Sequence, residues 1–148
     1  LNEALLSNYI ITHMKGSDLA KSVLSENLEN FEGTVLRQTL FAAFEREASK
    51  IVDQDETFTP DKLESIYLDL NKEWYGSKST FPEFTKYEWM RIPHFYSAFY
   101  VYKYATSYCA SLALSEAFFI DENITQFFFL HHHSQRVHII TFLPIANG

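Results

Sequence analysis

The chain has 148 residues, of which 47% are apolar and 21% charged, a composition that suits a folded domain and excludes a disordered segment. Its 19 acidic and 12 basic residues give a formal net charge of −7, which argues against nucleic acid as a partner because phosphate binding needs clustered Lys and Arg. No uncharged stretch approaches the roughly 20 apolar residues that a membrane span requires, so no membrane association is expected.

Long periodic segments, with only four Gly and four Pro, predict an all-α fold, because strands of ordinary length would need more frequent turns. The first predicted helix covers residues 2–15 and ends at Gly16, after which Ser17 or Asp18 caps the next helix. The helical pattern then continues for over thirty residues. Gly33 lies within it and predicts a bend or a close helix contact, because glycine weakens a helix interior.

A polar loop is predicted over residues 53–59, and Pro60 begins the next helix, which ends at Gly76. The predicted buried face of that helix comprises Leu63, Ile66, Tyr67, Leu70 and Trp74. Pro93 fits best at the front of a helix, because its ring is tolerated in the first turn. The last predicted helix therefore follows Pro93 and runs to about Phe119.

The last predicted helix carries a row of tyrosines at four-residue steps. The row comprises Tyr96, Tyr100, Tyr104 and Tyr108, with His94 at its start. A phenol stays protonated at neutral pH, so such a face could donate hydrogen bonds to an oxyanion. The same spacing also fits an amphipathic helix whose tyrosines reach solvent or backbone carbonyls, and spacing alone leaves both interpretations open.

Arg37 and Gln38 lie between apolar positions, where a charged side chain needs a carboxylate partner such as Glu45 or Glu3. A contact between Arg37 and a substrate terminus is the alternative. Cys109 is the single cysteine, so it is expected to be a small buried apolar residue in a cytoplasmic protein. The sequence contains no HExxH, Gly-rich phosphate loop or CxxC, and therefore no recognisable complete active site.

Four stretches together resemble oligoendopeptidase F, of the M3 family of zinc metallopeptidases. They are residues 1–6, 31–45, 68–76 and 89–106, the last of which reads WMRIPHFYSAFYVYKYAT. The resemblance covers residues 1–118 and implies an antiparallel helical bundle that forms the C-terminal part of such a catalytic domain, with all zinc ligands upstream of Leu1. Residues 119–148 do not resemble the family, and we expect a frameshifted end or one added by cloning.

The resemblance implies a cytoplasmic enzyme that hydrolyses internal bonds of short peptides, with zinc polarising the carbonyl and activating water. The family's oxyanion-stabilising histidine and tyrosines carry over to His94, Tyr100 and Tyr104. Tyr96 and Tyr102 are weaker candidates for substrate contact, together with Arg37. Glu3 matches the second Glu of the family's E-x-A-S-T-x-N-E run and would orient a metal ligand without binding the metal itself.

Alone, the chain is expected to bind no zinc, to lack peptidase activity and to self-associate through apolar faces that upstream helices would cover. Its first residue is Leu1 rather than Met, as expected for a piece of a longer protein. The three histidines at 131–133 are weak evidence for a native metal site. The competing hypothesis is a stand-alone helical binding module that uses its aromatic face as a groove.

Overall fold

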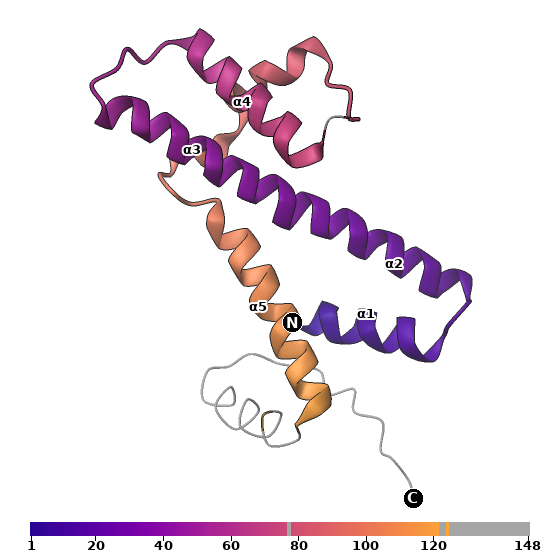
Figure 1. The fold of residues 1–148 in the computed structure, drawn as a ribbon. Helices are drawn as coiled ribbons and strands as arrows, with labels where there is room; N and C mark the ends of the chain where they lie inside the picture. The colour runs from indigo at the N-terminus through magenta and orange to yellow at the C-terminus, as the bar shows by residue number, and fades with distance from the viewer. Residues whose placement is uncertain (77, 122–123, 125–148) are drawn as a thin grey trace, which may run out of the picture. The chain divides into compact units, whose positions relative to one another are not determined.

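The computed structural model describes residues 1–76, 78–121 and 124 (Figure 1). Its described residues form two compact units, one within residues 24–109 and the other made of residues 1–23 with the described residues from 110 onward. All regular secondary structure of the described residues is helical, which confirms the predicted all-α class. The larger unit holds the apolar core and the candidate site.

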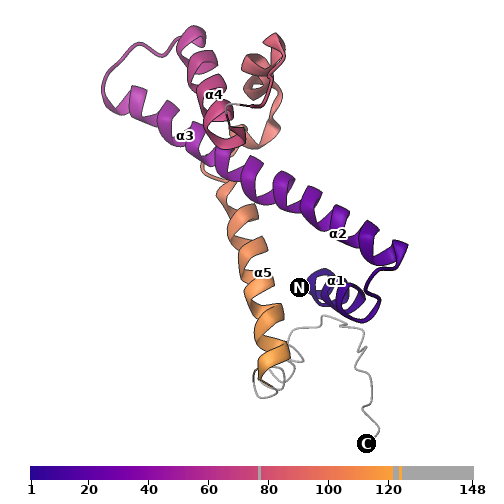
Figure 2. The same ribbon diagram turned by 45° about the vertical axis from the view of Figure 1, so that its right-hand side comes forward.

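The long helical segment predicted after Gly16 is present as three consecutive elements (Figure 2). They are α2 (Asp18–Phe31), the π-helical turn η1 (Glu32–Leu36) and α3 (Arg37–Asp53). Ser17 caps α2, because its hydroxyl accepts a hydrogen bond from the Ala20 N–H at 3.1 Å. Gly33 lies within η1, and no described atom comes within 4 Å of the position its Cβ would take. The close helix contact predicted as one explanation of this glycine is therefore wrong; it marks a widened helical turn instead.

Helix α4 (Pro60–Tyr75) has the bounds that the sequence predicts. The Thr59 side chain accepts a hydrogen bond from the Lys62 N–H at 3.4 Å, and Pro60 occupies the first turn, where its missing N–H costs nothing. Gly76 ends the helix with φ 82° and ψ 164°, a backbone conformation that is essentially restricted to glycine.

Gly76→Ala should therefore lower the free energy of unfolding by about 1–2 kcal/mol, as measured by urea denaturation. The cost comes from the backbone alone, because no described atom lies within 4 Å of the added Cβ. Gly33→Ala is the matched control: its Cβ also meets open space, but its backbone is helical, so that variant should be neutral or slightly stabilised. Equal destabilisation of the two variants would contradict this explanation.

The core of the larger unit lies where α3 packs beside α4 (Figures 1 and 2). Its buried members are Leu40, Phe41, Phe44 and Ile51 of α3, Leu63, Tyr67 and Leu70 of α4, and Ile92 and Val101 from the segment that follows. The Phe44 ring lies perpendicular to the Tyr67 ring at a centroid distance of 5.3 Å, a favourable aromatic geometry. The predicted apolar face of α4 is confirmed, with Ile66 and Trp74 partly buried at its margin.

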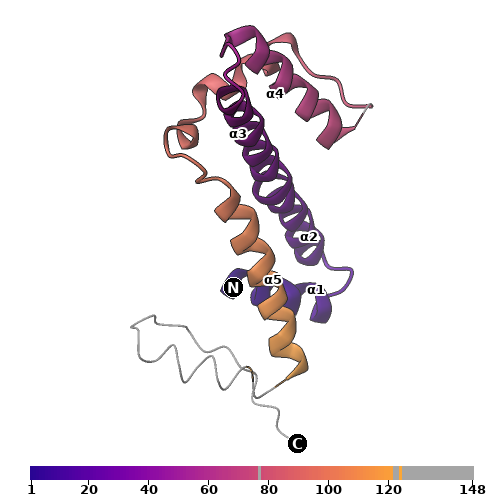
Figure 3. The same cartoon turned by 60° about the vertical axis from the view of Figure 1, so that its left-hand side comes forward.

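The single helix predicted after Pro93 is wrong over its first part (Figure 3). Two 3-10 helices, η2 (Glu83–Arg91) and η3 (Pro93–Tyr96), precede an irregular connection at residues 97–101, and α5 (Tyr102–Ile120) follows. Val101, at the end of this connection, is 0% exposed, and Ile92, just before η3, is 7% exposed, so the segment is anchored in the core at both positions. Tyr96 lies before the break at residues 97–101 and Tyr100 within it, whereas Tyr104 and Tyr108 lie on α5, and the four tyrosines therefore do not share a helix face.

Cys109 is exposed on α5, so its predicted burial is wrong. The reason is that α5 buries little of its surface: Ser115 is the one buried residue among its described positions, although most of the helix is apolar. The smaller unit combines α1 (Asn2–His13), the first predicted helix, with the end of α5. None of the described helices combines the length and apolarity needed to cross a membrane.

Most of the C-terminal tail predicted over residues 119–148 lies outside the described residues, which there include 119–121 and 124. The three histidines at 131–133 fall outside them altogether.

Candidate functional site

His94, Tyr100 and Tyr104 lie together where η3 leads into α5. The Nε2 atom of His94 and the Tyr104 hydroxyl are 3.1 Å apart. The Tyr100 ring stacks on the His94 ring at a centroid distance of 6.0 Å, and it lies nearly perpendicular to the Tyr104 ring at 5.5 Å. One imidazole and two phenols therefore form a single cluster, in which each ring contacts the other two.

The irregular connection between η3 and α5 creates this cluster. In an uninterrupted α-helix, the ten positions from His94 to Tyr104 would separate their backbones by about 15 Å along the axis. The chain instead turns back at residues 97–101, which brings the His94 side chain within hydrogen-bond distance of the Tyr104 hydroxyl. Burial of Val101 fixes the end of the turn, and burial of Ile92 fixes the start of η3.

The cluster is a set of hydrogen-bond donors at neutral pH. A hydrogen bond with Tyr100 raises the pKa of Tyr104 above its usual value of 10.0. The Tyr104 phenol therefore keeps its proton even more firmly than an isolated phenol does. Lys103 adds a positive charge nearby, with its Nζ 5.2 Å from the centroid of the Tyr100 ring. Such an arrangement can stabilise a developing negative charge without a prior proton transfer.

The remaining predicted site residues occupy other positions. Tyr96 is 87% exposed and borders a cavity of about 360 Å³, away from the described ring contacts of His94. Tyr102 is 49% exposed in the first turn of α5. Glu3 lies on α1 in the smaller unit. The structure does not bring these three residues into the described contacts of the cluster, and their roles stay predictions.

Arg37 belongs to a second polar cluster, formed between α3, α4 and η2. Its guanidinium forms an ion pair with Glu88, and lies over the Phe41 ring at 5.1 Å. The prediction of a carboxylate partner is confirmed, but the partner is neither Glu45 nor Glu3. Sequence reasoning missed Glu88 because it lies 51 positions from Arg37, beyond the range of helical spacing rules. A contact of Arg37 with substrate stays a prediction.

Glu88 is the centre of this second cluster. Its side chain is 15% exposed, and it also accepts a hydrogen bond from the Tyr67 hydroxyl at 2.9 Å. Burial opposes ionisation of Glu88, but the hydrogen bonds from Tyr67 and Arg37 outweigh it and hold its pKa below the usual 4.5. Burial, followed by the hydrogen bond to Glu88, raises the pKa of Tyr67. Glu88 is therefore a partly buried anion that joins η2 to both α3 and α4.

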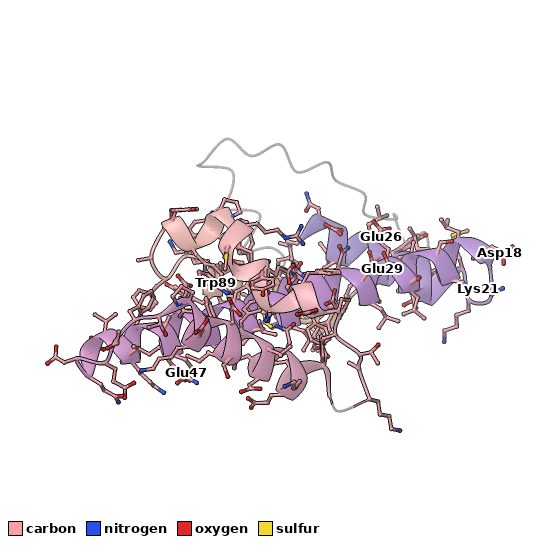
Figure 4. The ribbon with its side chains drawn as sticks, turned by 90° about the horizontal axis from the view of Figure 1, so that it is seen from above. Asp18, Lys21, Glu26, Glu29, Glu47 and Trp89 are labelled. Carbon is pink, nitrogen blue, oxygen red and sulfur yellow. The ribbon has the colours of Figure 1, made fainter. Side chains whose placement is uncertain are left out.

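Two further polar groups near the core have surroundings that the sequence analysis did not predict. Glu45 of α3 accepts a hydrogen bond from the backbone N–H of Phe99 at 3.0 Å, across 54 positions of sequence. Trp89, labelled in Figure 4, packs against the core near Phe44, at a centroid distance of 6.0 Å. Its indole Nε1 is buried and has no hydrogen-bond partner among the described residues. No local motif marks either residue.

No group of three or more His, Cys, Asp or Glu side chains within the described part of the chain could hold a metal ion. The cluster of His94, Tyr100 and Tyr104 offers one imidazole and two protonated phenols, a donor set unlike a zinc site, which uses imidazole, thiolate or carboxylate ligands. The described residues therefore do not make up a set of zinc ligands, which the resemblance places upstream of Leu1.

The helical scaffold and its cluster of donors fit part of a hydrolase, and comparison with known proteins identifies the class. The model of peptidase family M3 matches residues 1–130, and the chain belongs to this family. Over 114 residues it is 43% identical to oligopeptidase PepF of Bacillus subtilis (strain 168), covering 77% of this chain and 17% of that protein. The resemblance to oligoendopeptidase F is therefore confirmed.

Two further relatives show the same partial coverage. Group B oligopeptidase PepB of Streptococcus agalactiae is 38% identical over 116 residues, which are 78% of this chain and 19% of that protein. The oligoendopeptidase F homolog of Borreliella burgdorferi is 33% identical over 114 residues, 77% of this chain and 19% of that protein. The chain thus spans less than a fifth of the length of these relatives. No solved structure matches it.

Proposed function

We propose that this chain supplies the oxyanion-stabilising donors of a zinc-dependent oligoendopeptidase that cleaves internal bonds of short peptides. The observation that carries the proposal is the 3.1 Å contact between His94 and Tyr104, with Tyr100 against both rings. Membership of family M3 supports the peptidase class. The decisive experiment is Tyr100→Phe in the complete enzyme, with kcat measured separately from KM.

The proposed role follows from the charge change during peptide hydrolysis. When water attacks a peptide carbonyl, negative charge accumulates on the carbonyl oxygen, and donors already in place lower the energy of that state. The Tyr100 and Tyr104 hydroxyls carry their protons at neutral pH, so they can donate at once. His94 contacts the Tyr104 hydroxyl through Nε2; in the tautomer with the proton on Nε2, it donates to the Tyr104 oxygen and leaves the Tyr104 proton free to be donated to the oxyanion.

Zinc dependence and the catalytic base are proposed for residues outside this chain, because neither an HExxH motif in the sequence nor a suitable cluster among the described residues supplies them. Contacts with peptide substrate are proposed for Tyr96, Tyr102 and Arg37, and an orienting role toward a metal ligand for Glu3. A cytoplasmic location is proposed from the single cysteine. Self-association of the isolated chain is supported by exposed apolar side chains such as Ile120, which is 78% exposed.

The isolated chain should not cleave an internally quenched peptide, and after purification it should contain well under one zinc per chain. Both results are expected because the ligands and the catalytic base lie elsewhere. Fluorescence assays and elemental analysis of the same sample measure the two quantities, and a parallel sample treated with chelator is the control. Cleavage that a chelator abolishes, together with about one zinc per chain, would contradict this assignment.

A further inference from the structure

The connection that carries Tyr100 has little packing to hold it in place. Phe99, the residue before Tyr100, is 55% exposed and has φ 52°, which is uncommon for a residue other than glycine. The cavity of about 360 Å³ is bordered by Tyr96, Ala98 and Phe99, and all three residues are exposed. The conformation of Phe99 therefore needs another restraint.

Glu45 of α3 provides such a restraint. Its Oε1 accepts the hydrogen bond from the Phe99 N–H at 3.0 Å, which ties the strained residue to a helix of the core. Its Oε2 is buried and has no hydrogen-bond partner among the described residues. Burial raises the pKa of Glu45, and the Phe99 hydrogen bond offsets part of that effect. Burial of an ionisable carboxyl group costs free energy. The hydrogen bond that Glu45 accepts from the Phe99 N–H offsets part of this cost and explains why the carboxyl group lies here.

We propose that Glu45 is a positioning residue, which fixes the backbone at Phe99 and thereby holds the Tyr100 phenol against Tyr104 and His94. Phe99 and Tyr100 are consecutive, so rotation of the Phe99 backbone moves the Tyr100 ring. Val101, the residue on the other side, is 0% exposed. Tyr100 thus lies between one residue anchored by a hydrogen bond and another anchored by burial. The expected effect of Glu45 on catalysis rests on the proposed function, whereas its effect on the position of the Tyr100 phenol does not.

The test measures the interaction between Tyr100 and Tyr104. If Glu45 only stabilised the fold, this interaction would persist in every Glu45 variant that folds. Tyrosine labelled with ¹³C at Cζ reports the ionisation of each phenol by NMR, and Tyr104→Phe assigns the resonance. In the 148-residue chain the pKa of Tyr104 should lie above 10.0, because Tyr100 hydrogen-bonds to it. In Glu45→Ala the pKa of Tyr104 should return toward 10.0, because Tyr100 is released.

Two variants serve as controls. Glu45→Gln keeps an oxygen that can accept the Phe99 N–H, so it should retain the raised pKa of Tyr104. Glu47→Ala removes another carboxylate of α3, one that pairs with Arg46 and Lys50 instead of the connection, and should also retain it. If Glu45→Ala does not fold, Glu45→Asp is the second variant. Its carboxylate is charged but one methylene shorter, so it no longer reaches the Phe99 N–H, and the pKa of Tyr104 should again return toward its usual value.

An unchanged Tyr104 titration in folded Glu45→Ala or Glu45→Asp would overturn the proposal, and so would an equal loss in Glu47→Ala. The titration needs no peptidase activity, so its outcome is separate from that of the proposed function. If the Tyr104 pKa responds to Glu45 but Tyr100→Phe leaves kcat of the complete enzyme unchanged, the positioning role stands and the catalytic assignment fails.

Discussion

Tyr100→Phe, introduced into a complete peptidase that contains this chain, should lower kcat by about 10²–10³-fold with little change in KM. The substitution removes one hydroxyl and keeps the ring that stacks on His94. The lost donor is needed when charge develops on the carbonyl oxygen, so its absence raises the barrier without weakening substrate binding. Steady-state cleavage of an internally quenched peptide measures both constants.

Tyr87→Phe is the matched control for that experiment. Tyr87 lies on η2, is 41% exposed and has the Lys86 Nζ over its ring, outside the cluster. Loss of its hydroxyl should leave kcat unchanged. Near-normal kcat in Tyr100→Phe, in an enzyme that folds and binds substrate normally, would remove Tyr100 from the oxyanion-stabilising group.

Glu88→Gln should lower the free energy of unfolding by about 2–3 kcal/mol at neutral pH, as measured by urea denaturation. The amide keeps the shape of the side chain but removes the charge that pairs with Arg37. The loss of stability should be smaller than for a fully buried ion pair. The Arg37 side chain is 39% exposed, so water can solvate its charge in the variant. The Tyr67 hydroxyl keeps an acceptor in the variant, which also limits the cost.

The effect of Glu88→Gln should disappear in acid. The folded protein holds the pKa of Glu88 below the usual 4.5, so its carboxylate stabilises the fold above that pH, and this contribution is lost as pH falls through the folded-state pKa. Unfolding curves of both proteins should therefore converge as the pH falls below 4.5 and through the folded-state pKa of Glu88. Glu47→Gln, with a side chain 29% exposed, is the control and should cost under about 1 kcal/mol. A difference in the free energy of unfolding between Glu88→Gln and the unchanged protein that stays constant with pH would contradict the ion-pair explanation.

The sequence grouped His94, Tyr100 and Tyr104, and the structure brings them together, but not on the single helix that the sequence predicts. The four-residue spacing placed His94, Tyr100 and Tyr104 on one helix, and the resemblance to family M3 gave them a shared role. They do lie together, but across a break in the helix, and the spacing also selected Tyr96, which lies apart from them. Their grouping is a finding of the structure, and their chemical role is still a prediction.

Local chemistry was enough to determine the helical class and the bounds of α4. The Thr59 cap and Pro60 act on the first turn and Gly76 on the last, so each effect can be read from positions next to it. The need of Arg37 for a carboxylate also followed from its place among apolar residues, although the identity of that carboxylate did not.

The tertiary structure alone decided where the last helix starts and which groups support the site. Burial of Val101 and the hydrogen bond from the Phe99 N–H to Glu45 hold the irregular connection at residues 97–101, which interrupts the helical pattern of the sequence. Glu88 and Glu45 find their partners across 51 and 54 positions, and only the packing of α3 against the later segment brings those groups together. Spacing rules describe neighbours on one element, whereas this cluster depends on contacts between elements.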